Sequence, residues 1–366
     1  MSAAVLSTSA PNGASSIRVL VVDDSAVARE VLSTVLRRDG FEVEIASSAH
    51  TAAQRIASNR PDVVVLDLEM PGMGGLEFLD RIMRNAPIPV IVCSGIAQPG
   101  ARAAIRALEL GAVEVIPKPS IGIRSLLEEA ETPLGVMVRA AATAKTSRLG
   151  GRSERTLVPL PFVKPDISPS TVAWTGSVIA IGASTGGTEA LRTVLAELPP
   201  DSPPIVIVQH MPGAFTPAFA QRLNALCAID VREAKDGDVL QQGLALLAPG
   251  GHHIEISAHR GVPHVRVFDG LPVTGHCPSV DVLFRSAART LGPRAVGVLL
   301  TGMGTDGALG LKQMKDEGGH TIAQNEATCV VFGMPGEAVA LGAAREVSPL
   351  DDIASSLQAA VKTNTN

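Results

Sequence analysis

The chain has 366 residues, more than one hydrophobic core ordinarily supports, so two domains joined by a linker are expected. Hydrophobic residues make up 46% and charged residues 18%, a balance typical of globular rather than disordered chains. A formal net charge of −5 argues against a broad nucleic-acid-binding surface, and an aromatic content of 2% without tyrosine argues against base-stacking platforms. No nucleic-acid partner is therefore expected.

The sequence shows no sign of export or membrane insertion. Residues 1–16 are small and polar, lack the basic and apolar regions of a signal peptide, and are expected to be disordered. No apolar run approaches the ~20 residues that a membrane span needs. The cysteines are scattered without a C-x-x-C pair, which fits a cytoplasmic protein: Cys93, Cys227, Cys277 and Cys329.

Strand-like and helix-like segments alternate through the first part of the chain. The expected strands are 18–22, 41–45, 63–66, 89–93 and 113–116, and the expected helices are 26–38, 49–58, 76–84, 101–110 and 123–130. This alternation predicts a parallel, doubly wound sheet, so residues 17–135 are expected to form a flavodoxin-like (βα)5 domain of the α/β class.

The composition changes beyond this domain. Residues 136–175 are rich in Ala, Thr, Ser and Pro and are predicted to be a linker. A second doubly wound α/β domain is expected over 176–362, with strands at 178–181, 205–208, 244–247 and 296–301. The segments 253–257 and 264–268 flank a turn and predict an antiparallel hairpin, which would make a mostly parallel sheet mixed.

Polar residues follow the strands of the first domain. They are Asp23, Asp24, Asp67, Ser94 and Lys118. Ligands of an open parallel sheet bind beyond the carboxyl ends of its strands, so these side chains are expected to meet. Clustered carboxylates hold Mg²⁺, and Asp67 is central enough to carry a phosphoryl group whose oxygens Lys118 and the metal neutralise.

Three motifs of this domain resemble the response-regulator receiver family in order and spacing. They are Val21–Ser25, Asp67–Leu76 and Lys118-Pro119. The resemblance implies phosphorylation of Asp67 with a histidine kinase as phosphodonor. Val115 stands where receivers often carry an aromatic residue, so the aromatic part of the receiver switch is expected to be absent or altered.

The same resemblance implies the metal ligands and the remaining switch residues. Mg²⁺ is implied to be held by Asp24, Asp67 and the main-chain carbonyl of Glu69, and by Asp23 through water. The implied switch residues are Ser94 and Lys118.

Strand ends of the second domain carry a serine, a histidine and an aspartate. Ser184 follows the strand at 178–181, His210 follows that at 205–208, and Asp306 follows that at 296–301. This set suits nucleophilic acyl transfer, in which Ser184 attacks, His210 moves the proton and Asp306 orients the imidazole. The glycine-bracketed Met303 offers its amide as an oxyanion donor.

The glycine-rich loop around Ser184 has other interpretations. It could cradle a phosphate at a helix N-terminus, although no lysine follows the glycines as in a Walker loop. The pattern Gly182-x-Ser184-x-Gly186 matches the nucleophile elbow of α/β-hydrolases, but their triad order is Ser, Asp/Glu, His, whereas here it is Ser, His, Asp.

Four segments of the second domain resemble the CheB family of protein-glutamate methylesterases. They are Ile181–Gly187, Gln209–Met211, Pro278–Phe284 and Leu300–Gly307. The resemblance implies a Ser184–His210–Asp306 triad, with Thr185 and the Met303 backbone lining the site. It implies methanol release from glutamate γ-methyl esters of chemoreceptors and deamidation of receptor glutamines. No cofactor is needed for ester hydrolysis.

Regulation and recruitment follow from the same resemblance. The receiver is expected to cover the catalytic rim until Asp67 is phosphorylated, and the protein is expected to be recruited to receptor arrays at the inner membrane face. Cys277 stands where relatives usually carry arginine, which bears on substrate choice or rate. The histidines between 252 and 276 are expected to be surface or core residues. A non-catalytic signalling protein that binds a partner or nucleotide at the glycine-rich loop is the alternative.

Overall fold

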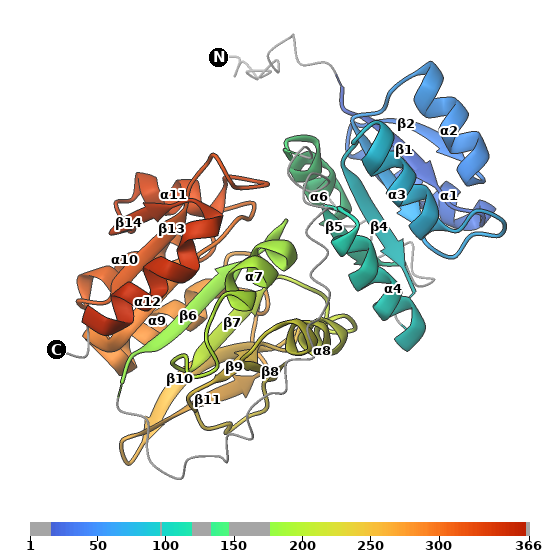
Figure 1. Ribbon diagram of the computed structural model, residues 1–366. Helices are drawn as coiled ribbons and strands as arrows, with labels where there is room; N and C mark the ends of the chain where they lie inside the picture. The colour runs from blue at the N-terminus through green and yellow to red at the C-terminus, as the bar shows by residue number, and fades with distance from the viewer. Residues whose placement is uncertain (1–15, 96, 119–132, 146–175, 364–366) are drawn as a thin grey trace, which may run out of the picture.

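The computed structural model in Figure 1 describes residues 16–95, 97–118, 133–145 and 176–363. The predicted disorder of the N-terminal residues 1–15, the predicted helix at 123–130 and most of the predicted linker lie outside these ranges. Among the described helices, none combines the length and the apolar character that crossing a bilayer requires.

The first half of the chain is a parallel five-stranded sheet in the order β2-β1-β3-β4-β5, which confirms the flavodoxin-like prediction. The strands are β1 (Arg18–Val22), β2 (Glu42–Ala46), β3 (Val63–Asp67), β4 (Val90–Ser94) and β5 (Glu114–Pro117). The helices are α1 (Ala26–Arg38), α2 (Ala49–Ser58), α3 (Gly75–Asn85) and α4 (Gln98–Glu109). The residues of β3 and β4 are all buried, as expected for central strands that helices cover on both faces.

A further helix, α6 (Pro133–Ala142), covers the face of this sheet that α1 also covers. Leu134, Val138 and Ala141 are buried in the same hydrophobic cluster as Val19 and Val21 of β1. Their spacing of four and three residues places them on one side of a helix. The predicted start of the linker, residue 136, therefore falls within a helix that packs on the first domain.

The second half contains a parallel sheet of seven strands in the order β14-β13-β12-β6-β7-β9-β8. Its strands are β6 (Val178–Ala183), β7 (Ile205–Gln209), β8 (Asp230–Glu233), β9 (Leu244–Leu247), β12 (Ala295–Leu299), β13 (His320–Gln324) and β14 (Glu346–Ser348). The short edge strands β8 and β14, and β13, were not predicted. β6 lies between β7 and β12, so the carboxyl ends of these three strands are adjacent.

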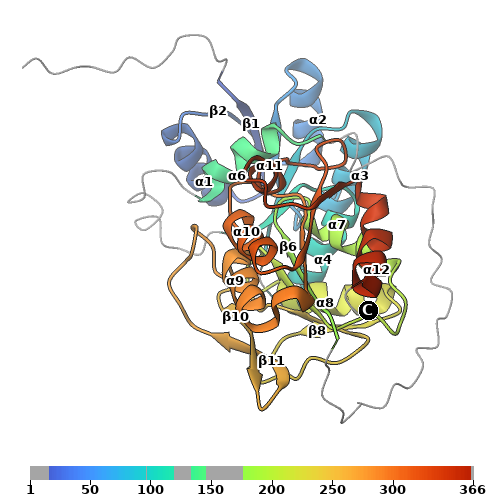
Figure 2. The same ribbon diagram turned by 90° about the vertical axis from the view of Figure 1, so that its left-hand side faces the viewer.

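Helices cover both faces of the second sheet, and Figure 2 shows the two layers on either side of β6. The first layer is α7 (Gly187–Ala196), α8 (Thr216–Leu226) and α12 (Ile353–Thr363). The second layer is α9 (Val280–Leu291), α10 (Ala308–Asp316) and α11 (Met334–Ala340). This is the doubly wound architecture that the sequence predicts.

The predicted hairpin exists, but the expectation that it joins the main sheet is wrong. β10 (His253–His259) and β11 (Val262–Phe268) form a two-stranded sheet of their own. The reason is that β10 bonds to a helix instead of a third strand: the Ile256 amide donates to Ser286 Oγ at 2.8 Å, and Thr290 Oγ1 donates to the Ile256 carbonyl at 3.0 Å. Both partners lie on α9.

Candidate active site and phosphoacceptor site

Ser184 lies in the tight turn between β6 and α7. Gly186 precedes α7 with φ of 75°, a left-handed conformation that glycine adopts without strain. A Cβ on Gly302 would lie 2.7 Å from the Cβ of Ser184, so the β12 loop approaches the serine closely only because that residue is glycine. The serine is 7% exposed. The turn and the neighbouring loop therefore hold it firmly at the carboxyl edge of the sheet.

His210 and Asp306 meet beside this edge, as the strand ends predict. His210 Nε2 lies 2.9 Å from Asp306 Oδ2. His210 Nδ1 is buried and has no hydrogen-bond partner among the described residues, and no hydrogen bond joins His210 to Ser184 there. With Nε2–H donated to the aspartate, Nδ1 carries the lone pair and is the nitrogen left to accept a proton.

Asp306 is held by more hydrogen bonds than the sequence indicates. It is 1% exposed. Its donors are His210 Nε2 at 2.9 Å, Ser279 Oγ at 2.8 Å, Thr274 Oγ1 at 2.8 Å, and the amides of Val280 at 2.7 Å and Asp281 at 3.1 Å. Burial raises the pKa of Asp306, but these hydrogen bonds, led by that from His210, outweigh it and hold the pKa well below the usual aspartate range. The carboxylate therefore stays ionised beside the imidazole.

His276 is a site residue that sequence reasoning did not find. Its ring stacks on that of His210, with centroids 3.7 Å apart and planes 8° from parallel. Burial, and then the neighbouring His210, lower the pKa of His276 to about 4. The ring is therefore neutral near neutral pH and supports His210 without adding charge. Only its nearness to the Pro278–Phe284 motif could have drawn attention to it.

Two backbone amides near Ser184 are free to bind an oxyanion. Those of Thr185 and Met303 donate no hydrogen bond to another residue in the described part of the chain. Thr185 directly follows the serine, the position that supplies one donor in nucleophile elbows. Thr301 Oγ1 donates to the Thr185 carbonyl at 3.1 Å and so ties the two loops together. Both residues were predicted from the sequence to line the site.

The first domain brings its predicted carboxylates together at its own strand ends. Oxygens of Asp23, Asp24 and Asp67 lie within 4.8 Å of one another. Asp23 Oδ2 is buried without a hydrogen-bond partner, and burial, with Asp67 adding to it, raises the pKa of Asp23. An orphaned carboxylate oxygen in such a cluster is what a hard divalent cation satisfies, so these residues fit Mg²⁺.

The other predicted receiver residues surround Asp67. Lys118 Nζ lies 2.8 Å from Asp67 Oδ2, and the Glu69 amide donates to Asp67 Oδ1 at 3.0 Å. Burial alone lowers the pKa of Lys118, but the Asp67 carboxylate outweighs burial and raises it. Ser94 is buried and donates to the Gly100 carbonyl at 3.2 Å, so its hydroxyl is engaged away from Asp67.

Comparison with known proteins assigns both halves. The family model for CheB methylesterase matches residues 179–357, and that for the response regulator receiver domain matches residues 19–131. The protein-glutamate methylesterase/protein-glutamine glutaminase 1 of Anaeromyxobacter dehalogenans is 51% identical over 348 residues, which cover 93% of this chain and 98% of that protein. The chain belongs to the CheB methylesterase family. Relatives with the same two-part name from Geobacter metallireducens and Pseudomonas syringae are each 49% identical over 92% of this chain and 97% of their own length.

The receiver of this CheB-family chain contacts the loops of the candidate active site. Glu114, on β5, lies beside Thr185, the residue next to Ser184, whose side chain partly opposes the rise that burial causes in the pKa of Glu114. Val330, from the loop before α11, is buried in one hydrophobic cluster with Ile116 of β5, and Met303 packs against that cluster. In Figure 1, α4 lies on the side of the receiver that faces α7 and α8, and Glu109 of α4 pairs with Arg222 of α8.

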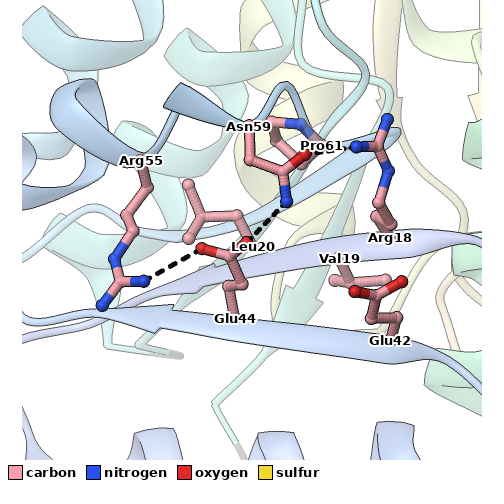
Figure 3. A pocket seen from close by; sticks show the side chains of 8 residues that line it. All are labelled: Arg18, Val19, Leu20, Glu42, Glu44, Arg55, Asn59 and Pro61. Atoms are coloured by element: carbon pink, nitrogen blue, oxygen red, sulfur yellow. Dashed lines mark hydrogen bonds and ion pairs between the residues drawn. The ribbon is translucent and has the colours of Figure 1, made fainter. Parts of the chain in front are cut away.

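A separate pocket on the receiver lies far from this chemistry. Figure 3 shows it at the start of β1 and the middle of β2. Several of its polar side chains are bonded to one another: Arg55 Nη1 lies 3.2 Å from Glu44 Oε2, Asn59 Nδ2 donates to Glu44 Oε1 at 2.8 Å, and Arg18 donates to Asn59. Parallel strands begin at the edge of the sheet opposite Asp67, so this pocket lies at the end of the domain away from the phosphoacceptor site.

Proposed function

We propose that this chain hydrolyses glutamate γ-methyl esters of chemoreceptors at Ser184, and deamidates receptor glutamines there, under the control of phosphorylation at Asp67. The observation that carries the proposal is the His210–Asp306 pair at 2.9 Å, whose second imidazole nitrogen is unpaired, on loops adjacent to Ser184. The names of the full-length relatives support both activities. Because chemoreceptors are the substrate, the protein is expected to be recruited to receptor arrays.

The arrangement accounts for each proton transfer. Ser184 Oγ attacks the ester carbonyl while His210 Nδ1 takes the hydroxyl proton, and the resulting oxyanion accepts hydrogen bonds from the Thr185 and Met303 amides. His210 then returns the proton to the departing methoxide, which leaves as methanol. Water, deprotonated by the same nitrogen, hydrolyses the acyl-enzyme to glutamate. With a glutamine side chain the departing group is ammonia, and neither reaction requires a cofactor.

On the receiver, a histidine kinase is the proposed phosphodonor to Asp67. The residues that would hold Mg²⁺ are Asp23, Asp24, Asp67 and the main-chain carbonyl of Glu69. When bound, the ion supplies charge neutralisation for the phosphoryl oxygens. Lys118, already 2.8 Å from Asp67 Oδ2, binds one of those oxygens, and Ser94 leaves the Gly100 carbonyl to bind another.

Replacing Asp67 with alanine is expected to abolish stimulation by a small phosphodonor and leave the basal rate of methanol release in place, because the phosphoryl acceptor is lost while the triad is untouched. The measurement is methanol release from a methylated receptor with and without phosphodonor. Asp80→Ala is the matched control, since it removes only an exposed carboxylate that pairs with Arg84 on α3 and should leave stimulation intact. Stimulation that persists in Asp67→Ala would show that the receiver is not the switch.

Glu114 is buried where the receiver meets the loop of Thr185, so the basal rate is expected to depend on pH. Burial raises the pKa of Glu114 to about 7, although the Val115 amide and the Thr185 side chain partly oppose this. When the receiver leaves the rim, the carboxyl regains its ordinary, lower pKa. The covered form therefore binds the proton more tightly, so it is favoured at low pH and is weakened as pH rises towards about 7.

Glu114→Gln is expected to lower the basal rate several-fold at pH 8 relative to wild type, because the amide stays uncharged and keeps the receiver in place. The two proteins should converge near pH 5, where wild-type Glu114 is protonated in the covered form. The measurement is the ratio of the Glu114→Gln rate to the wild-type rate, without phosphodonor, at each pH. Taking the ratio cancels the titration of the triad itself. Glu42→Gln, an exposed carboxylate on β2, is the control. A ratio that does not change with pH contradicts the role of Glu114.

A further inference from the structure

We infer that Asp281 is a positioning residue for the triad: it caps helix α10 and thereby fixes the turn that carries Asp306. The inference rests on the proposed function, in which Asp306 orients His210. It concerns a residue that contacts neither Ser184 nor His210 in any hydrogen bond among the described residues.

Asp306 closes the N-terminus of α9. The first two amides of this helix, those of Val280 and Asp281, donate to the Asp306 carboxylate at 2.7 and 3.1 Å. The N-cap residue Ser279 donates its hydroxyl to the same carboxylate at 2.8 Å and accepts from the Val282 amide. A carboxylate is favoured at this end of a helix, where unpaired amides and the helix dipole stabilise negative charge. Asp306 is thus held from the side of α9.

In return, α9 supplies an aspartate that accepts from the first turn of α10. Asp281 Oδ1 accepts from the Gly310 amide in the first turn of α10 at 2.7 Å. No side chain at the N-cap position of α10 does this, because that position is Gly307. Asp281 of α9 therefore closes the N-terminus of α10, and Asp306, which directly precedes the cap of α10, closes the N-terminus of α9.

The two helices approach closely enough for this exchange only because of glycines. A Cβ on Gly310 would lie 2.7 Å from the Cβ of Phe284 and 3.0 Å from Asp281 Oδ1. A Cβ on Gly307, which has φ of 86°, would lie 2.5 Å from Val280 Cγ1. Both glycines belong to α10 or its cap. The close contact is thus specific to the segment that follows Asp306.

The consequence for the reaction lies in the geometry of Asp306. This residue directly precedes Gly307, so loosening the first turn of α10 shifts the carboxylate against His210. A displacement of about 1 Å at a reacting group costs roughly 100-fold in rate. Burial raises the pKa of Asp281, which is 1% exposed, although Arg285 Nη2, at 3.2 Å from Oδ2, partly offsets the cost of the charge; the group that faces α10 is the acceptor oxygen Oδ1. An asparagine at this position should therefore keep the function.

The test uses the full-length protein with saturating phosphodonor, and measures kcat and KM for methanol release from a methylated receptor. Asp281→Ala is expected to lower kcat by about 10- to 100-fold with little change in KM. Asp281→Asn is expected to recover kcat to within about threefold of wild type, because its amide oxygen still accepts from Gly310. Asp281→Glu, which lengthens the side chain within the same buried space, is a second disruptive variant should Asp281→Ala fail to fold.

Two controls separate positioning from general stability. Ser286→Ala removes another buried hydrogen-bonding side chain of α9, the one that accepts from Ile256, and should lower stability without lowering kcat. In an Asp306→Asn background, Asp281→Ala should cause little further loss, since the two residues act as one unit. A loss of full size in that background, a wild-type kcat in both disruptive variants, or an Asp281→Asn variant as slow as Asp281→Ala overturns the inference.

Amide hydrogen exchange provides a readout that does not depend on activity. Exchange across residues 305–310 should be faster in Asp281→Ala than in wild type, and unchanged in Asp281→Asn and Ser286→Ala. Unchanged exchange in Asp281→Ala overturns the inference. A wild-type protein that releases no methanol contradicts the proposed function instead, and the exchange result still decides whether Asp281 holds the turn.

Discussion

Replacing Ser184 with alanine is expected to reduce methanol release from a methylated receptor by roughly 10⁴-fold or more, because no nucleophile remains to form the acyl-enzyme. The fold should persist, since the Ser184 hydroxyl makes no hydrogen bond to another described residue, while its amide and carbonyl are bonded to Thr301 and Gly187 and do not change. The measurement combines the methanol assay, in the presence of phosphodonor, with thermal unfolding.

The matched control for this variant is Ser202→Ala. Ser202 is also buried, at 3% exposure, and its hydroxyl donates to the Pro199 carbonyl at 2.7 Å in the turn after α7. Its removal should lower stability slightly and leave the rate unchanged. If Ser184→Ala retains substantial activity, the assignment of the nucleophile is wrong, and the glycine-rich loop regains its alternative interpretation as a binding site.

Asp306→Asn is expected to reduce kcat by roughly 10³- to 10⁴-fold, because the buried carboxylate both selects the imidazole tautomer and stabilises the imidazolium that forms during the reaction. All five groups around it donate hydrogen bonds, so the amino group of an asparagine must face at least one donor. The variant should therefore also unfold at a lower temperature. The measurement is kcat beside the unfolding temperature.

Asp238→Asn is the control for Asp306→Asn. Asp238 also accepts several hydrogen bonds, from Arg232 and from the Lys235 amide at 2.7 Å, but it lies in the connection between β8 and β9. Burial raises the pKa of Asp238, yet Arg232 and the Lys235 amide outweigh burial and lower it. Its replacement should cost stability alone. If Asp306→Asn behaved in the same way, with kcat close to wild type, Asp306 would not be the residue that orients His210.

Much of the site was predictable because parallel strands end at one edge. That rule brought Ser184, His210 and Asp306 onto neighbouring loops, and the structure places β6 between β7 and β12 as the rule requires. It also gathered Asp23, Asp24 and Asp67. The end of a strand can be identified from the local sequence, so these positions could be predicted before the fold was known.

Contacts that depend on the meeting of two loops were not predictable. His276 stacks on His210 because the loop after β11 folds back over the sheet edge, and no spacing in the sequence encodes that path. The bond between Asp281 and Gly310 joins the first turns of two helices, which the sequence separates by a whole strand. The hairpin was predicted from two strand-like segments that flank a turn, but that pattern does not say whether β10 will bond to a strand or to α9.

We propose that one chain couples phosphorylation at Asp67 to ester hydrolysis at Ser184. The most direct measurement is the rate of methanol release from a methylated chemoreceptor by the wild-type protein, before and after addition of Mg²⁺ and a small phosphodonor. We expect a low basal rate that rises on phosphorylation and falls back as the phosphoryl group is lost. An absence of methanol, or a rate that phosphorylation does not change, would contradict it.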